Sequence, residues 1–143
     1  MEDIRIELMT TEDLNQVADV FLQVFNALGE NWGKESATKH VNENFSGDSH
    51  FVAKINNRII GFIMAIPLTR EKGTELFVDS IAILPDYQHK GVGQKLWDKI
   101  EESSKDGEYV AIRLLANKQL KSFNWYKSLG YQESGWIELY REL

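Results

Sequence analysis

Apolar residues near the start of the chain follow first the spacing of a strand and then that of helices. Residues 4–8 alternate apolar and polar side chains, which predicts a short strand. Residues 10–28 carry apolar side chains at helical spacing behind Thr10, a residue type that caps helices, and Gly29 is the expected stop. Residues 36–45 predict a second, less apolar helix. The chain is therefore expected to open with a strand followed by two helices.

The middle of the chain predicts a meander of antiparallel strands. Residues 51–55 and 58–68 are strand-like segments separated by Asn56 and Asn57. Asparagine tolerates the positive φ that a two-residue turn requires, so the two segments are expected to form a hairpin. Residues 76–84 are apolar on both faces, which is typical of a central strand that is covered on each side.

The second half of the chain alternates helices and strands. Amphipathic helices are expected over residues 91–104 and 119–128, on either side of a strand at residues 109–115, and residues 131–143 predict one or two closing strands. Strand, helix and strand in this order form a crossover unit. The whole pattern predicts a single α/β domain over residues 1–143, with a mixed sheet and helices on both of its faces.

Composition narrows the class of protein. The chain has 143 residues, a net charge of -6 and no cysteine. Its acidity argues against general nucleic-acid binding, which needs clustered Lys and Arg. Without cysteine there are no disulfides or thiolate ligands, and the three histidines show no metal-ligand spacing, so no metal site is expected. No stretch approaches the ~20 apolar residues of a membrane span or resembles a signal peptide, so we expect a cytoplasmic protein without membrane contact.

A glycine-containing turn follows the predicted central strand. Gly91 and Gly93 lie at the first turn of the next helix, and Lys90 adds a positive charge. Backbone N–H groups at a helix start are unpaired and lie at the positive end of the helix dipole, so this turn predicts a phosphate site. A dinucleotide-binding turn would need a third glycine where this chain has Leu96, and a Walker-type loop would need a lysine where it has Gln94.

Two segments of the chain resemble the GNAT superfamily of N-acetyltransferases. The first contains the acyl-CoA motif Q/R-x-x-G-x-G/A as Gln88-His89-Lys90-Gly91-Val92-Gly93. The second is Leu115-Ala116-Asn117, followed by Ser122-Phe123, Tyr126 and Leu129-Gly130-Tyr131. The resemblance covers essentially the whole chain. It implies a GNAT-like α/β fold, in which a mixed, mostly antiparallel sheet splays at a central parallel strand pair.

The resemblance also implies which residues hold acetyl-CoA as the cosubstrate. The pantetheine arm would lie between the two splayed strands, against the backbone of Ile81, Ala82 and Ile83. Asn117 would contact the pantetheine or the arriving amine, and Tyr126 would lie near the thioester sulfur. The pyrophosphate would be held by the amides of Gln88, His89, Lys90, Gly91, Val92, Gly93 and Gln94.

Acyl transfer to an amine needs proton transfers, for which three side chains are candidates. A typical alkylammonium titrates near ~10, so a base or a water chain must remove a proton. Asp79 and Glu75 are the candidate bases, because an even number of positions separates them on the central strand and they therefore lie on the same face. Asp79 is preferred. The alternative interpretation of Asp79 is a structural carboxylate that a neighbouring Arg, Lys or amide holds. Many family members carry a glutamate where this chain has Phe77, which leaves the base open. Tyr126 has the chemistry to protonate the leaving thiolate, its alternative being core packing.

The expected acceptor is a primary amine on a small molecule or peptide, and the acidity of the chain suits a polycationic one. Residues 25–37 are similar to aminoglycoside acetyltransferases, and Trp32 would border the acceptor pocket, whereas Trp97 and Trp125 are expected in the core. The alternatives are a CoA-binding module without turnover and a phosphotransferase, which the missing Gly-Lys-Ser/Thr disfavours. A strand at residues 136–140 would allow a homodimer.

Overall fold

The computed structural model describes residues 3–143, and these form one five-stranded sheet in the order β1-β2-β3-β4-β5. The strands are β1 (Arg5–Leu8), β2 (His50–Ile55), β3 (Arg58–Arg70), β4 (Gly73–Ile83) and β5 (Ala111–Leu114). The first four pair in antiparallel fashion, whereas β4 and β5 are parallel. The predicted mixed, mostly antiparallel sheet is confirmed.

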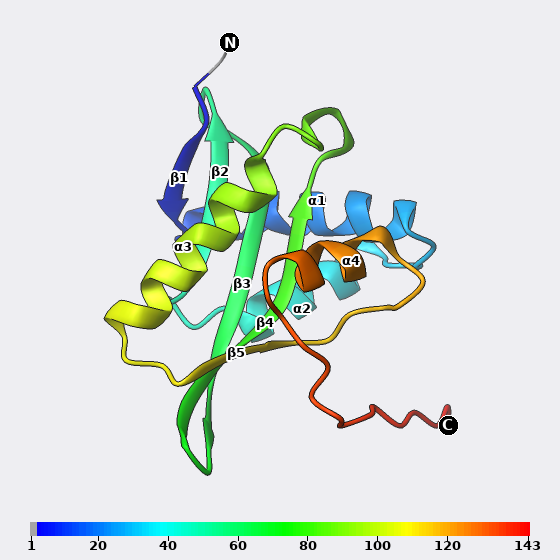
Figure 1. Cartoon of the computed structure of the whole chain (residues 1–143). Helices are drawn as coiled ribbons and strands as arrows, with labels where there is room; N and C mark the ends of the chain where they lie inside the picture. The colour runs from blue at the N-terminus through cyan, green and yellow to red at the C-terminus, as the bar shows by residue number, and fades with distance from the viewer. Residues whose placement is uncertain (1–2) are drawn as a thin grey trace.

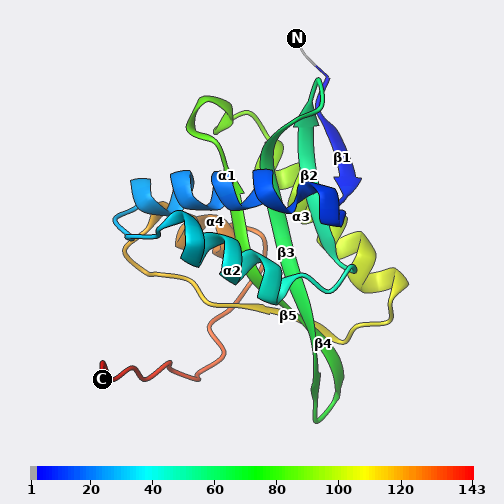
Figure 2. The same cartoon turned by 180° about the vertical axis from the view of Figure 1, so that it is seen from behind.

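Helices lie on both faces of this sheet, as predicted (Figures 1 and 2). They are α1 (Leu14–Ala27), α2 (Lys34–Asn44), α3 (Val92–Asp106) and α4 (Lys121–Ser128). Helices α1 and α2 cover one face and α3 covers the other. Trp97 of α3 is fully buried, which confirms its expected place in the core, whereas Trp125 of α4 is only partly buried and packs against Trp97. Within residues 3–143, no helix combines the length and apolar character that crossing a membrane demands.

The hairpin between β2 and β3 turns at the two asparagines that predicted it. Asn56 has a φ of 50° and Asn57 a φ of 67°, both in the left-handed region that asparagine tolerates better than most residues. Strand β3 then runs on for 13 residues and pairs along nearly its whole length with β4. Strand β3 is therefore the middle strand of the sheet, with β4 between it and β5.

Strands β4 and β5 separate part-way along β4. Their pairing begins at Glu75 and Ala111 and ends at Val78 and Leu114, while β4 continues to Ile83 against β3. The edge of β4 that faces β5 is therefore without a strand partner beyond Val78, which is the predicted splay.

A β-bulge lies where the splay begins. Val78 pairs with Ala65 and Ser80 pairs with Met64, so Asp79 is an extra residue on β4. Bulges bend a strand and redirect a side chain, and they occur often beside functional sites. Asp79 is thus both the bulged residue and the first residue of β4 past the end of the parallel pairing.

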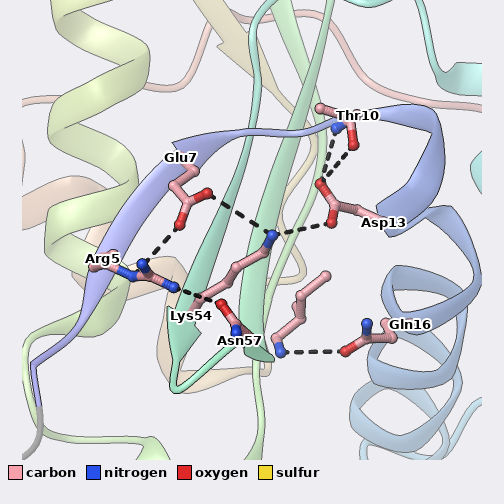
Figure 3. Close-up of polar contacts among 8 residues, drawn as sticks. Arg5, Glu7, Thr10, Asp13, Gln16, Lys54 and Asn57 are labelled. Carbon is pink, nitrogen blue, oxygen red and sulfur yellow. Dashed lines mark hydrogen bonds and ion pairs between the residues drawn. The ribbon is translucent and has the colours of Figure 1, made fainter.

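Polar contacts tie the first strand to the hairpin and to the start of α1 (Figure 3). Lys54 Nζ on β2 lies 3.2 Å from Asp13 Oδ1 and 3.8 Å from Glu7 Oε1. Asp13 Oδ2 also accepts a hydrogen bond from the backbone N–H of Thr10 at 2.9 Å. Thr10 is the cap of the short 3-10 turn that leads into α1, close to where the sequence predicts a helix start.

The C-terminal segment differs from its prediction. Residues 131–143 were expected to form one or two strands, and the structure contains none there. The backbone N–H of Tyr131 donates to Tyr126 O at 3.2 Å, but residues 132–143 form no backbone-to-backbone hydrogen bond with any described residue. A strand requires a neighbouring strand to pair with, and an alternating sequence alone does not supply one.

Candidate active site

The turn between β4 and α3 presents a run of backbone N–H groups. Gly91 is the N-cap residue of α3 with a φ of 83°, and His89 has a φ of 62°. The first backbone hydrogen bond of the helix joins Lys95 N–H to Gly91 O at 3.1 Å. Within the described chain, the N–H groups of residues 89–94 have no acceptor. Unpaired N–H groups at the positive end of a helix dipole suit an anion such as phosphate.

The two glycines of this turn keep the approach to those N–H groups open. A Cβ placed on Gly91 or on Gly93 would meet no heavy atom within 4 Å. A larger side chain at either position would therefore occupy open space above the helix start, where a phosphate oxygen would have to approach the amides. The turn fits a pyrophosphate group.

The free edge of β4 leads directly into this turn. Backbone groups alternate along a strand, so those of Ala82 point to β3, whereas those of Ile81 and Ile83 point to the splay. The side chain of Gln88 folds back and donates from Nε2 to Ile83 O at 2.8 Å. The Ile83 carbonyl is thus already hydrogen-bonded within the chain, and Gln88 ties the turn to the end of the strand.

Tyr126 and Asn117 lie on the far side of the splay, around α4. Tyr126 packs against the rings of Trp97 and Trp125, and burial raises the pKa of its hydroxyl to about 12. Asn117 Oδ1 accepts from the backbone N–H of Gln119 at 2.9 Å, which fixes the side chain at the start of α4. Both residues line a cleft of about 980 Å³, which includes none of residues 88–94.

Asp79 on β4 meets His40 on α2, a partner that the sequence analysis did not find. His40 Nε2 lies 2.9 Å from Asp79 Oδ2, and the Asn44 amide donates to His40 O at 2.8 Å. A proton on Nε2 would bond the carboxylate and leave Nδ1 as the free nitrogen. The available signal was the helical spacing of His40 with the buried Ala37, three residues earlier.

An aromatic wall stands beside this pair. The Trp32 ring lies 4.7 Å from that of Phe21 and 5.2 Å from that of His40, measured between centroids. The side chain of Asn26 accepts from Trp32 N at 2.7 Å and donates to Trp32 O at 2.9 Å. Trp32 Nε1 donates to Glu30 Oε1 at 2.7 Å. The loop between α1 and α2 therefore holds Trp32 next to the histidine that contacts Asp79.

Glu75, the second candidate base, is held by two arginines. Arg113 Nε and Nη2 donate to its two carboxylate oxygens at 2.9 and 3.2 Å, and Arg70 Nε lies 3.7 Å away. The hydrogen bond from Arg113 holds the pKa of the Glu75 carboxyl below its ordinary value. A carboxylate stabilised in this way is a weak base, which argues against Glu75 as a proton acceptor. The sequence analysis gave, as the alternative for Asp79, a carboxylate held by a neighbouring Arg, Lys or amide. The neighbour that contacts Asp79 is a histidine, His40.

The sequence of this chain matches the profile of a known protein family. A profile described as Acetyltransferase (GNAT) family matches residues 12–131, a span that contains the turn, Asp79, Asn117 and Tyr126. The chain belongs to this family. GNAT membership confirms the resemblance of the two motifs, and it agrees with the splayed sheet and with the helices on both faces.

Solved GNAT structures share the fold at low sequence identity. The aminoglycoside N-acetyltransferase AAC(6')-Iy in complex with CoA has a TM-score of 0.80 and 17% identity, with 99% of this chain and 96% of that chain covered. The ribosomal-protein-alanine N-acetyltransferase of Brucella melitensis biovar Abortus 2308 has a TM-score of 0.79 and 15% identity, covering 99% and 100%. No match to this chain is found among curated proteins.

A third GNAT structure, an aminoglycoside acetyltransferase from an uncultured soil metagenomic sample in complex with sisomicin, has a TM-score of 0.77 and 19% identity, covering 98% and 96%. The three proteins share one fold, although two are described as aminoglycoside acetyltransferases and one as a ribosomal-protein-alanine N-acetyltransferase. At these identities the likeness establishes the fold, and the acceptor must be argued from the residues of this chain.

Proposed function

We propose that this chain transfers an acetyl group from acetyl-CoA to a primary amine by direct attack in a ternary complex. The observation that carries the proposal is the run of unpaired N–H groups at residues 89–94, next to the free edge of β4. A nucleotide pyrophosphate joined to an amide-containing arm needs these two features side by side. Membership of the GNAT family supports the same reaction class.

The chain divides the binding of acetyl-CoA between the turn and the splay. Residues 88–94 hold the pyrophosphate, with Lys90 adding charge, and the backbone of Ile81 on the free edge of β4 pairs with an amide of the pantetheine arm. Gln88 supports the turn through Ile83 O. Asn117 holds the arm or the amine from the other side of the splay. Bound acetyl-CoA supplies an activated acyl group, so no covalent enzyme intermediate is required.

The Asp79–His40 pair takes the proton from the attacking amine. With a proton on Nε2, His40 donates to Asp79 Oδ2, and Nδ1 is then the nitrogen that accepts a proton, directly or through water. The same carboxylate attracts the ammonium form of the acceptor before it loses its proton. Glu75 has no part in the proton transfer, because Arg113 stabilises its charged form.

Tyr126 acts as the proton donor to the leaving thiolate. A thiol of ordinary pKa, about 8.5, leaves more easily when a hydroxyl donates to the sulfur. Burial raises the pKa of Tyr126 to about 12, so the hydroxyl keeps its proton throughout the working pH range. The side chain is therefore always in the donor form.

The acceptor is a cationic amine, on a small molecule or a peptide, that binds beside Trp32, His40 and Asp79. An aromatic ring next to a carboxylate binds an ammonium through cation–π and ionic attraction. The net charge of -6 favours the approach of polycationic acceptors. The acetyl transfer then joins the amine nitrogen to the acyl carbon and releases the CoA thiol and one proton.

A thermal-shift and thiol-release experiment tests this proposal. Unfolding temperature is measured with acetyl-CoA, CoA, NAD and ATP, since a ligand at 100 times its Kd adds ~2.7 kcal/mol to stability. Thiol release from acetyl-CoA is then followed with a panel of amines. The chain contains no cysteine, so every thiol detected comes from CoA.

Gly93→Val provides the matched variant for the binding step. Gly93 has a negative φ and open space around it, so valine should fold normally and block the amides, raising the Kd for CoA at least ~10-fold. Gly33→Val makes the same change at the start of α2 and should leave CoA affinity intact. Stabilisation by CoA without thiol release from any amine would indicate a binding module, and stabilisation by ATP alone would indicate a phosphotransferase.

A further inference from the structure

The loop that joins α1 to α2 begins with a Schellman motif. Gly29 has a φ of 102°, and its N–H donates to Asn26 O at 3.1 Å. The N–H of Glu30 donates to Phe25 O, also at 3.1 Å. These two bonds satisfy carbonyl groups at the end of α1, and glycine is the residue type that most easily adopts the positive φ they require. The path of the chain out of α1 is therefore fixed as far as Glu30.

Beyond Glu30, the side chain of Asn26 holds the chain by a pair of hydrogen bonds. Asn26 Oδ1 accepts from the backbone N–H of Trp32 at 2.7 Å, and Asn26 Nδ2 donates to Trp32 O at 2.9 Å. A carboxamide carries both an acceptor and donors, so it satisfies the two backbone groups of one residue at once, which a carboxylate or an apolar side chain cannot do. A residue of α1 thus fixes the main chain of Trp32.

This pair of bonds determines where the Trp32 ring lies. The ring meets that of Phe21 edge to face, at a centroid distance of 4.7 Å and an interplanar angle of 84°, and its centroid lies 5.2 Å from that of His40. The indole Nε1–H, the only polar hydrogen of the ring, donates to Glu30 Oε1 at 2.7 Å. Trp32 is only partly buried, so a ligand is able to reach it. The ring therefore offers its apolar surface, and no hydrogen-bond donor, to a ligand beside it.

We infer that Asn26 is a positioning residue for the amine acceptor and that it acts through Trp32. The inference rests on the proposed function, in which the acceptor binds beside Trp32, His40 and Asp79. A ring that is already held in its binding position loses less conformational entropy when the acceptor binds, and this strengthens binding. Asn26 therefore sets the KM for the amine and leaves the proton transfer to His40 and Asp79.

The fold does not depend on the bonds between Asn26 and Trp32. Helices α1 and α2 lie next to each other on one face of the sheet (Figure 2), and both contribute buried apolar side chains, such as Val24 and Val41, to the core. The Schellman motif uses backbone groups alone, so it remains when the Asn26 side chain is replaced. Alanine also has a higher helix propensity than asparagine. Asn26→Ala should therefore fold normally and loosen only residues 31–33.

Hydrogen exchange measures these bonds without any reaction. In Asn26→Ala the amide of Trp32 loses its acceptor and should exchange at least ~10-fold faster than in the natural chain. The amide of Ala37, which donates to Gly33 O at 3.0 Å, should exchange at an unchanged rate. The matched control is Asn42→Ala, which removes another asparagine side-chain bond to a carbonyl, at 2.7 Å, from an exposed position of α2. It should leave the Trp32 amide protected.

Steady-state kinetics then measure the effect on the acceptor. Asn26→Ala should raise the KM for the amine ~10-fold and change kcat and the Kd for CoA by less than about twofold. Trp32→Ala should also raise the KM. Because Asn26 acts through Trp32, the double variant should have the same KM as Trp32→Ala alone. A purely structural role would instead lower the unfolding temperature and leave the KM of Asn26→Ala unchanged.

The two measurements separate failure of this inference from failure of the proposed function. If the natural chain acetylates an amine, the positioning role is overturned by an unchanged KM in Asn26→Ala, by a further rise in KM in the double variant, or by equal exchange of the Trp32 amide in both chains. If the natural chain releases no thiol with any amine, the proposed function is overturned and the positioning role with it, even where hydrogen exchange shows that the bonds exist.

Discussion

His40 Nε2 lies 2.9 Å from Asp79 Oδ2, although the two residues are 39 positions apart in the chain. Helix α2 brings the histidine to the sheet, and the bulge in β4 brings the carboxylate to the point where the parallel strands separate. The His40 ring also lies 5.2 Å from the ring of Trp32, measured between centroids. The contact between His40 and Asp79 is the structural basis of the proposed proton acceptor.

Substitution of this pair should slow turnover without weakening the binding of CoA. We expect Asp79→Asn and His40→Gln each to lower kcat ~100-fold, the lower end of the range for general base catalysis. Because the two residues act as a unit, the double variant should be little slower than either single one. Steady-state kinetics and the Kd for CoA check this. Lys39→Gln, on the same helix but exposed, should behave as the natural enzyme, and a kcat that both variants leave unchanged would remove the pair from the mechanism.

Loss of the Tyr126 hydroxyl should affect the departure of the thiolate. Tyr126→Phe is expected to lower kcat ~10²-fold with little change in the Kd for CoA. Because burial raises the pKa of this hydroxyl to about 12, the natural enzyme should show no fall in rate due to Tyr126 up to about pH 10. The control is Tyr131→Phe, which loses the hydrogen bond that Trp97 Nε1 donates at 2.9 Å and should lower stability while sparing turnover. Equal loss of rate in both variants would argue for a packing role.

Glu75 should prove structural. Glu75→Gln breaks the paired hydrogen bonds to Arg113 and is expected to lower the unfolding temperature while leaving kcat unchanged. Since the folded pKa of Glu75 lies below its ordinary 4.5, the stability it contributes is present above pH 4.5 and is lost as the pH falls through the folded value. Arg113→Gln should show the same thermal loss. A large fall in kcat at an unchanged unfolding temperature would instead restore Glu75 as the base.

His50 should make the fold sensitive to mild acid. Its side chain is buried, and desolvation lowers its pKa from 6.5 to about 4. The unfolded chain therefore binds the proton more readily, so stability is complete above pH 6.5 and falls by about 3 kcal/mol as the pH drops to 4. Urea unfolding at several pH values measures the slope. His50→Gln should start less stable but lose less over this window, and a slope equal to that of the natural chain would contradict the assignment.

Much of the fold was readable from local pattern. Helical spacing identified α1 and α3, and the paired asparagines identified the hairpin because φ values of 50° and 67° are a local requirement. The turn at residues 88–94 was also readable locally, because glycine is the residue type that most easily adopts a positive φ. Gly91 has a φ of 83° at the start of α3, and the space around it is open. Family resemblance added the splay, and the strand register then placed it after Val78.

The candidate site could be predicted only in part. Asp79, Asn117 and Tyr126 were singled out by motif and by residue type, and their roles remain proposals. His40 was missed because its importance depends on a contact across 39 residues. Glu75 was plausible as a base by its place in the strand, and only the position of Arg113, 38 residues further on, shows that its carboxylate is already paired.

The sequence by itself determined the elements up to α4, their order, the glycine turn and the family, because each depends on neighbouring residues or on a short motif. The tertiary structure alone decided the pairing of His40 with Asp79, the neutralisation of Glu75 by Arg113, and the fate of residues 131–143. Side-chain partners and strand partners come from distant parts of the chain, and alternation shows that a segment is able to form a strand without showing what it pairs with.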